Sequence, residues 1–177
     1  MKRTKEDAGE TARQILQAAQ RLFLDNGYDK VSLDEIADDI GLTRGAIHWH
    51  FKNKQGLLLA LRDEAKDPFR ELAAHPAEAT LEKVYQVIHG ILDHFENDPR
   101  QQGLIRCMIR LDLTLAESNV ECSLAFRKEI HDLYVEIFEA VERNSGLPEP
   151  WTAESAATAL HTTLDGLFIG WALGVGS

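Results

Sequence analysis

The chain has 177 residues, of which 44% are hydrophobic, and this is enough for a globular protein with a core of its own. Its 12 glycines and 5 prolines are few, which favours helices over β-sandwiches. The formal net charge of −10 argues against a protein that coats nucleic acid without sequence preference. We find no signal peptide and no apolar run that could span a bilayer, so we expect a soluble protein.

The charge is distributed unevenly. Residues 1–55 carry nine basic and nine acidic side chains, and the remainder carries 10 Lys or Arg and 20 Asp or Glu. A neutral segment with local basic points, attached to an acidic remainder, suits specific docking on DNA. The two cysteines, Cys107 and Cys122, lie in helical patterns, and we expect reduced, mostly buried thiols in a cytoplasmic protein. The alternative is a redox pair.

The first predicted helix covers residues 11–26, because apolar side chains recur there at helical spacing and Gly27 follows as a stop. Residues 1–10 are polar, and we expect them to be frayed. Their basic side chains form either an arm that touches phosphates or a solvated tail.

The segment from Ser32 to Lys54 predicts a helix-turn-helix. Ser32 and Glu35 form a capping box, and an amphipathic helix follows until Gly41, which supplies a left-handed residue. Thr43 is a good N-cap for a second helix. A short turn containing glycine between two short helices is typical of this motif.

The outward face of the second helix carries hydrogen-bond donors, an aromatic ring and a glycine that admits a close backbone, all of which suit a DNA groove. These candidate DNA-binding residues are Thr43, Arg44, Gly45, His48, Trp49, His50 and Lys52. For Arg44 we favour bidentate bonding to guanine over a solvated helix-end charge. Asn53 caps the next helix and places Lys54 at its N-terminus, where a phosphate would bind.

The remaining pattern is helical throughout, without repeats or β-alternation. We expect a helix from Asn53 to about residue 72 with an interruption near Pro68, and then three helices between residues 80 and 117. The first of these three covers residues 81–97, and a break around residues 107–109 separates the other two.

A long helix covers residues 120–144, and Thr152 caps the final helix. Both have more apolar surface than one neighbour requires, which favours a four-helix homodimer interface built from the last two helices of each chain.

A small-molecule site is predicted in the second part of the chain. His161 and Asp165 are four residues apart and share a helix face, and apolar side chains from earlier helices could converge on them. The candidate ligand-binding residues are Ile88, Leu92, Leu104, Met108, His161, Asp165 and Trp171. The alternative is ordinary core packing with an internal hydrogen bond. A buried and unpaired Asp165 would favour a cationic or hydroxyl-rich ligand.

We expect no metal site and no cofactor. His48 and His50 point to different faces of a helix, and no carboxylate cluster joins them. A small helical enzyme with a Cys/His pair is a distant alternative, because the sequence lacks a nucleophile elbow, a metal constellation and a phosphate-binding glycine loop.

The chain resembles the tetracycline-repressor (TetR) family of bacterial transcription regulators. The residues that carry this resemblance stand in the family's order and spacing: Thr11, Arg13, Leu22-Phe23, Gly27, Ser32-Leu33, Ile36-Ala37, residues 41–47, residues 50–54 and Leu57-Leu58. The Thr-Arg-Gly-Ala-Ile core and the segment from His161 to Trp171 are similar to the AcrR-like branch that represses multidrug efflux pumps.

This resemblance implies an all-α homodimer of about nine helices, with a DNA-binding domain over residues 1–53 and a ligand-binding and dimerisation domain over residues 54–177. It implies base and backbone contacts by Thr43, Arg44 and Gly45, and phosphate contacts by His48, His50 and Lys54. A small hydrophobic or cationic inducer would release the protein from a palindromic operator. The alternative is a TetR-like regulator of metabolite or fatty-acid genes.

His48 departs from the family, which usually has Tyr at this position. An imidazole is shorter and can become charged, so we expect a weaker phosphate contact that strengthens as the pH falls.

Overall fold

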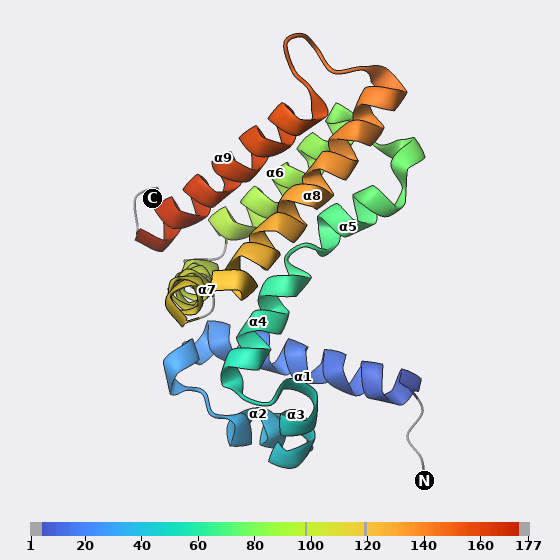
Figure 1. Cartoon of the computed structure of the whole chain (residues 1–177). Helices are drawn as coiled ribbons and strands as arrows, with labels where there is room; N and C mark the ends of the chain where they lie inside the picture. The colour runs from blue at the N-terminus through green and yellow to red at the C-terminus, as the bar shows by residue number, and fades with distance from the viewer. Residues whose placement is uncertain (1–4, 98, 119, 174–177) are drawn as a thin grey trace. The chain divides into compact units, whose positions relative to one another are not determined.

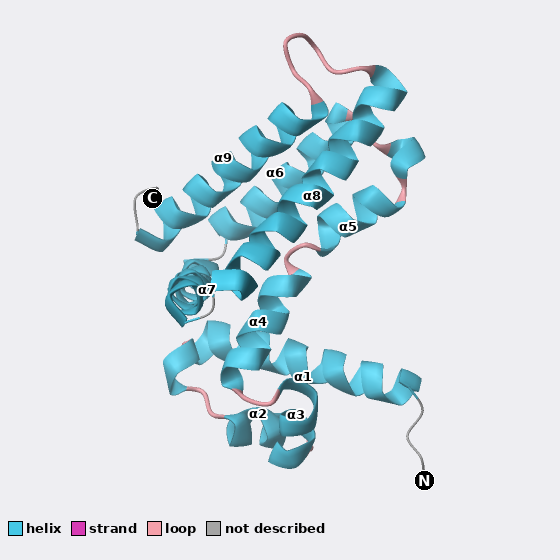
Figure 2. Cartoon of the chain, in the orientation of Figure 1, coloured by secondary structure: helices cyan, strands magenta, loops and turns pink. Residues whose placement is uncertain are grey.

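The computed structural model describes residues 5–97, 99–118 and 120–173. All regular structure in these ranges is helical, as Figures 1 and 2 show, and the all-α prediction is confirmed. The helices are α1 (Lys5–Asn26), α2 (Leu33–Asp39), α3 (Arg44–Phe51), α4 (Lys54–Glu64), α5 (Asp67–Ala74), α6 (Leu81–Asn97), α7 (Pro99–Ser118), α8 (Val120–Ser145) and α9 (Ala153–Leu173), with the 3-10 turns η1 (Tyr28–Lys30) and η2 (Pro76–Glu78). None of these helices is long and apolar enough to cross a membrane.

The predicted caps are present. The Ser32 hydroxyl accepts a hydrogen bond from the backbone N–H of Glu35, and the Glu35 carboxylate accepts one from the Ser32 N–H. The Ser32 N–H and the Ser32 hydroxyl both donate to the Glu35 carboxylate, and these two bonds hold the pKa of Glu35 below its ordinary value. Thr43 caps α3 and Thr152 caps α9 in the same way, through the N–H groups of Ala46 and Ser155. Local side-chain chemistry therefore sets where these helices begin.

Two sequence-based expectations about helix bounds were wrong. Helix α1 begins at Lys5 instead of residue 11, and side-chain pairs such as Glu10 with Arg13 at 2.5 Å support the turns before residue 11. The break expected around residues 107–109 is absent, and α7 continues through it. No Gly or Pro stands at these three positions, so nothing in the backbone favours a break there. The side chain of Cys122 lies outside those that the structure describes, and Cys107 is half-buried.

The chain forms two compact units, residues 1–64 and residues 65–177. Helix α4 belongs to the first unit, because Leu57, Leu58 and Leu61 are buried and the helix packs on α1 and α3. The first unit therefore extends past the boundary that we predicted at residues 53 and 54.

The second unit is built around α8 and α9, which pack along each other (Figure 1). Their shared core includes Tyr134, Ile137, Val141, Ala157 and Leu164, and α5 adds to it on the α8 side. A smaller cluster joins α7 to the end of α9.

The contact between α3 and α4 depends on a glycine. A Cβ atom added to Gly56 would lie 1.9 Å from the backbone oxygen of Phe51. The Gly56 N–H also donates to the Asn53 side chain at 2.8 Å, so Asn53 caps α4 as expected. Only a residue without a Cβ allows the end of α3 to approach α4 this closely.

We predict that Gly56→Ala lowers the free energy of unfolding by about 1–3 kcal/mol, because the backbone of Phe51 must move away from the added methyl group. Gly90→Ala is the matched control, since an added Cβ in that exposed turn of α6 meets nothing within 4 Å. The control should raise stability by about 0.4–1 kcal/mol. Urea denaturation of the two variants compares them, and equal effects would contradict the close α3–α4 contact.

Candidate functional site

The first candidate site is the outer face of α3. Ile47 is fully buried on the inner face of this helix, and the Trp49 side chain on the other side is 66% exposed. The structure exposes six of the eight residues predicted to bind DNA, whereas His50 and Lys54 are half-buried. The exposed six are Thr43, Arg44, Gly45, His48, Trp49 and Lys52. These exposed residues, on α3 and at its caps Thr43 and Lys52, make up the outer face of α3, and their contact with DNA stays a prediction.

Arg44 is held from α2. Its Nη1 atom lies 3.2 Å from Oδ2 of Asp34, and both side chains are mostly exposed. A solvent-exposed pair of this kind contributes at most about 1 kcal/mol, so the guanidinium can leave it for a better partner. Asp34 is thus an exchangeable partner of Arg44. Sequence reasoning missed this contact, because it joins two helices across the turn.

Two further features of the outer face suit a close approach by another backbone. An added Cβ at Gly45 would meet only the Thr43 hydroxyl oxygen, at 3.7 Å, so this part of the face is open. The ring of Trp49 packs edge-on against His50 at 4.5 Å between centroids. This packing leaves the Trp49 ring exposed and restrains the half-buried His50.

The α3–α4 junction places its two lysines differently. Lys52 is exposed and has a φ of 67°, an unusual backbone conformation for a residue with a side chain. Lys54 is half-buried, and its Nζ atom donates to the backbone oxygens of Tyr28 and Val31 at 2.7 and 2.9 Å. The structure thus separates two residues that the sequence had placed in one group of DNA contacts.

The second candidate site lies between α8 and α9. Asp165 is half-buried and its Oδ2 atom is 2.5 Å from Nη1 of Arg127 and 3.8 Å from Nε2 of His161. The condition for a cationic ligand, a buried and unpaired Asp165, is therefore not met. Arg127 was missed because it stands 38 positions away in the sequence and only the pairing of the two helices brings it here.

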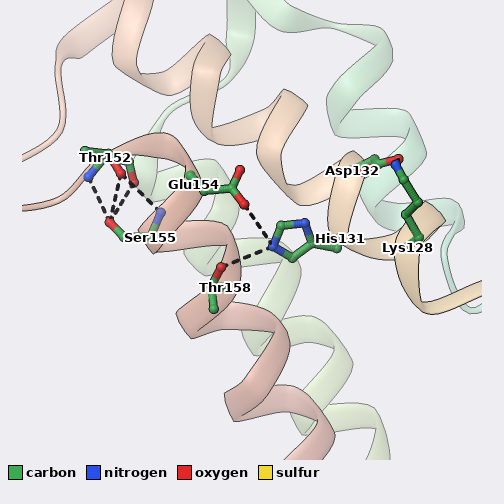
Figure 3. Close-up of polar contacts among 7 residues, drawn as sticks. All are labelled: Lys128, His131, Asp132, Thr152, Glu154, Ser155 and Thr158. Carbon is green, nitrogen blue, oxygen red and sulfur yellow. Dashed lines mark hydrogen bonds and ion pairs between the residues drawn. The ribbon is translucent and has the colours of Figure 1, made fainter. Parts of the chain in front are cut away.

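A second histidine joins this group from α8. The rings of His131 and His161 are 5.9 Å apart, and the Tyr134 ring lies edge-on to His161. Figure 3 shows that His131 also points toward the first turns of α9, where Nε2 is 3.2 Å from the Thr158 hydroxyl and 3.7 Å from the Glu154 carboxylate. Polar side chains therefore line this part of the α8–α9 contact.

Burial changes the pKa values of two of these side chains. It raises the pKa of Tyr134 above its ordinary value, and the charge of Asp165 adds to this effect. Burial also lowers the pKa of His161, although Asp165 acts in the opposite direction. His161 is therefore held preferentially in its neutral form.

The apolar candidates for a ligand site are divided between two clusters. Ile88 packs against the larger core of α5, α8 and α9, whereas Trp171 is buried in the smaller cluster with α7. Leu92 packs against both clusters, Leu104 is buried, and Met108 is half-buried. Core packing accounts for these contacts, and the ligand-binding function of the residues stays a prediction. Within the described side chains, no group of three or more His, Cys, Asp or Glu could hold a metal ion.

The lowered pKa of His161 predicts how stability changes with pH. In the unfolded chain the imidazole has an ordinary pKa of about 6.5. As the pH falls below this value, the unfolded chain takes up a proton more readily than the folded protein, so His161 reduces stability progressively toward the folded-state pKa. We compare stability at pH 7.5 and pH 5.5, about one unit above and one unit below that ordinary pKa. Over this interval we expect His161→Gln to lose less stability than the wild type. Urea denaturation measures this difference.

Thr162→Ala, a change at an exposed and non-titrating neighbour on α9, is the control for the effect of substitution itself. An unchanged pH dependence in His161→Gln would contradict the lowered pKa.

Comparisons with known proteins agree with this architecture. The model of the family described as "Bacterial regulatory proteins, tetR family" matches residues 15–61, which include α2, α3 and most of α4. The HTH-type transcriptional repressor BepR of Brucella suis is 31% identical over 97% of this chain and 85% of its own length. The HTH-type transcriptional regulator TtgR of Pseudomonas putida is 32% identical over 98% of this chain and 85% of its own length.

Among solved structures, the SmeT–triclosan complex superposes with a TM-score of 0.62 at 25% identity, and the match covers 91% of this chain and 79% of that one. SmeT is described as the repressor of a multidrug efflux pump of Stenotrophomonas maltophilia. The exposed face on α3, the helical second unit and these similarities to relatives over 97–98% of this chain lead to one assignment, which also excludes the enzyme alternative: the chain belongs to the TetR family of bacterial transcriptional regulators.

Proposed function

We propose that this regulator represses a multidrug efflux operon and is released from its operator by a small hydrophobic ligand. The observation that carries the proposal is the exposed outer face of α3, held in place by the Ser32 and Thr43 caps. The efflux assignment is supported by relatives, since the similar structure of SmeT is that of an efflux-pump repressor. We expect the protein to act in the cytoplasm, where operator DNA is found.

The outer face of α3 supplies two kinds of contact in this proposal. Thr43, Arg44 and Gly45 stand at the N-terminus of the helix, and we assign them to base edges and the adjacent backbone. The second kind, contacts to phosphates and sugars, is assigned to the residues that follow: His48, Trp49, His50 and Lys52. We leave Lys54 out of this set, because its ammonium already has backbone partners.

A homodimer through α8 and α9 would pair two reading helices on a palindromic operator. Its support is the apolar surface that remains on α9, where Leu167, Ile169 and Leu173 are exposed. Covering such side chains with a second copy would remove apolar area from water.

Of the two ligand classes predicted from the sequence, the ion pair of Asp165 with Arg127 favours a neutral hydrophobic molecule over a cationic one. A carboxylate that already has a cationic partner at 2.5 Å gains less from a cationic ligand. The SmeT complex holds triclosan, and this supports a small hydrophobic compound as the class to screen first. Selection of bound duplexes from a random library, followed by a screen for compounds that release them, tests both parts of the proposal.

Arg44 provides the test of base reading. We expect Arg44→Ala to weaken binding to the selected operator by about 1–3 kcal/mol and to relax discrimination at one base pair in each half-site. Arg44→Lys is the matched control, because it keeps the charge and loses the bidentate fork. Fluorescence anisotropy with operator and single-substituted duplexes measures both variants. If Arg44→Lys discriminates as well as the wild type, Arg44 supplies charge only.

His48 provides a second test. We expect the operator affinity of the wild type to increase as the pH falls from about 8 to about 6, because an imidazole can take up a proton in this range and then carries a positive charge. A His48→Tyr variant cannot gain this charge, and its affinity should depend less on pH. Anisotropy titrations of the two proteins across this range compare their slopes, and equal slopes would contradict a phosphate contact by His48.

A further inference from the structure

Lys54 is the first residue of α4, and its side chain turns back toward the connection between α1 and α2. The Nζ atom donates to three backbone oxygens, those of Tyr28 at 2.7 Å, Val31 at 2.9 Å and Asp29 at 3.3 Å. An ammonium group has three protons, so these acceptors account for all of its donors. The Tyr28 ring lies beneath the charge, with its centroid 4.5 Å from Nζ.

The three acceptors belong to one short segment, the turn η1 and the residue after it. Carbonyl groups at the end of a helical turn lack partners within the turn, and a cation satisfies them well. Val31 is buried, and the next residue, Ser32, is the N-cap of α2. The Lys54 ammonium therefore connects the first residue of α4 to the segment from which α2 begins.

The same end of α4 is also tied to α3. Gly56 packs against the Phe51 carbonyl so closely that no side chain fits between them, and Asn53 caps the first turn of α4. The contacts of Lys54 add the segment before α2 to this group. The start of α2, the end of α3 and the start of α4 are therefore joined by direct contacts. A phosphate contact by Lys54 would require this ammonium to leave three acceptors.

We propose that Lys54 is a positioning residue, which ties α4 to the start of α2 through the Tyr28, Asp29 and Val31 carbonyls and thereby sets the orientation of the α2–α3 reading unit. In this proposal its charge does not contact the DNA backbone. The inference rests on the DNA binding proposed above.

Lysine labelling tests the carbonyl contacts without any DNA. Reductive methylation of the full chain, followed by mass spectrometry of the two sites, compares the rate at Lys54 with the rate at exposed Lys52. We expect Lys54 to react about tenfold more slowly, a factor that a charge-assisted hydrogen bond of ordinary strength would produce. Equal rates would overturn the proposal.

The salt dependence of operator binding tests the positioning function. A lost phosphate contact reduces the slope of log affinity against log salt by about 0.9. We expect Lys52→Met to show this reduction at each half-site. Lys54→Met should keep the wild-type slope, while its operator affinity falls about tenfold, as for loss of a charge-assisted hydrogen bond. The same fall in slope for both variants would overturn the proposal.

Lys54→Arg separates charge from geometry. The planar guanidinium keeps the charge but cannot place its donors as a compact ammonium does. We expect this variant to bind the operator as weakly as Lys54→Met, and full restoration of affinity would show a charge contact with DNA and overturn the proposal.

If the wild type selects no duplex at all, the proposed function fails, whereas the labelling result still decides the carbonyl contacts. Labelling also uses the wild type, so it does not depend on whether a variant folds.

Discussion

The close approach of the Phe51 carbonyl to Gly56 is the constraint on which the first unit depends. It brings the end of α3 against α4, and it leaves α3 with one buried side at Ile47 and one exposed side at Arg44 and Trp49. A side chain at position 56 would separate the two helices and change the direction in which the outer face of α3 points. Hydrogen bonds to base edges tolerate little misplacement of the side chains that make them. The residues of that face can therefore read bases only when the packing behind α3 is tight.

The second unit depends on a different kind of contact, the pairing of α8 with α9. Its apolar core is continuous from Tyr134 to Leu164, and polar side chains lie beside it where His131 and Asp165 meet partners on the opposite helix. Ion pairs that are partly solvated contribute modestly to stability, and their main effect is to define which residues face each other. The Arg127–Asp165 pair thus fixes which residues of α8 and α9 face each other and gives the carboxylate a cationic partner within the protein.

Much of the fold could be predicted from the sequence because its signals are local. Ser32 with Glu35, Thr43, and the glycines at 27 and 41, with φ of 85° and 66°, act within a few residues of themselves. The failures have local causes as well. Residues 5–10 are polar and continue α1 without an apolar stripe, so the helical pattern could not be seen there. In α7, apolar residues stand on more than one face, and this weakened the helical pattern of one continuous helix.

By itself, the sequence determined the helical class, the helix-turn-helix segment and the residues that face outward from α3, since caps, turn glycines and helical spacing depend only on neighbours in the chain. Tertiary structure decided what those residues contact. Asp34 reaches Arg44 across a turn, Arg127 reaches Asp165 from another helix, and Lys54 reaches the carbonyls of Tyr28 and Val31. Such partners are set by how helices pack, because a charged side chain takes the acceptors that packing brings within hydrogen-bond distance, however far away they stand in the sequence.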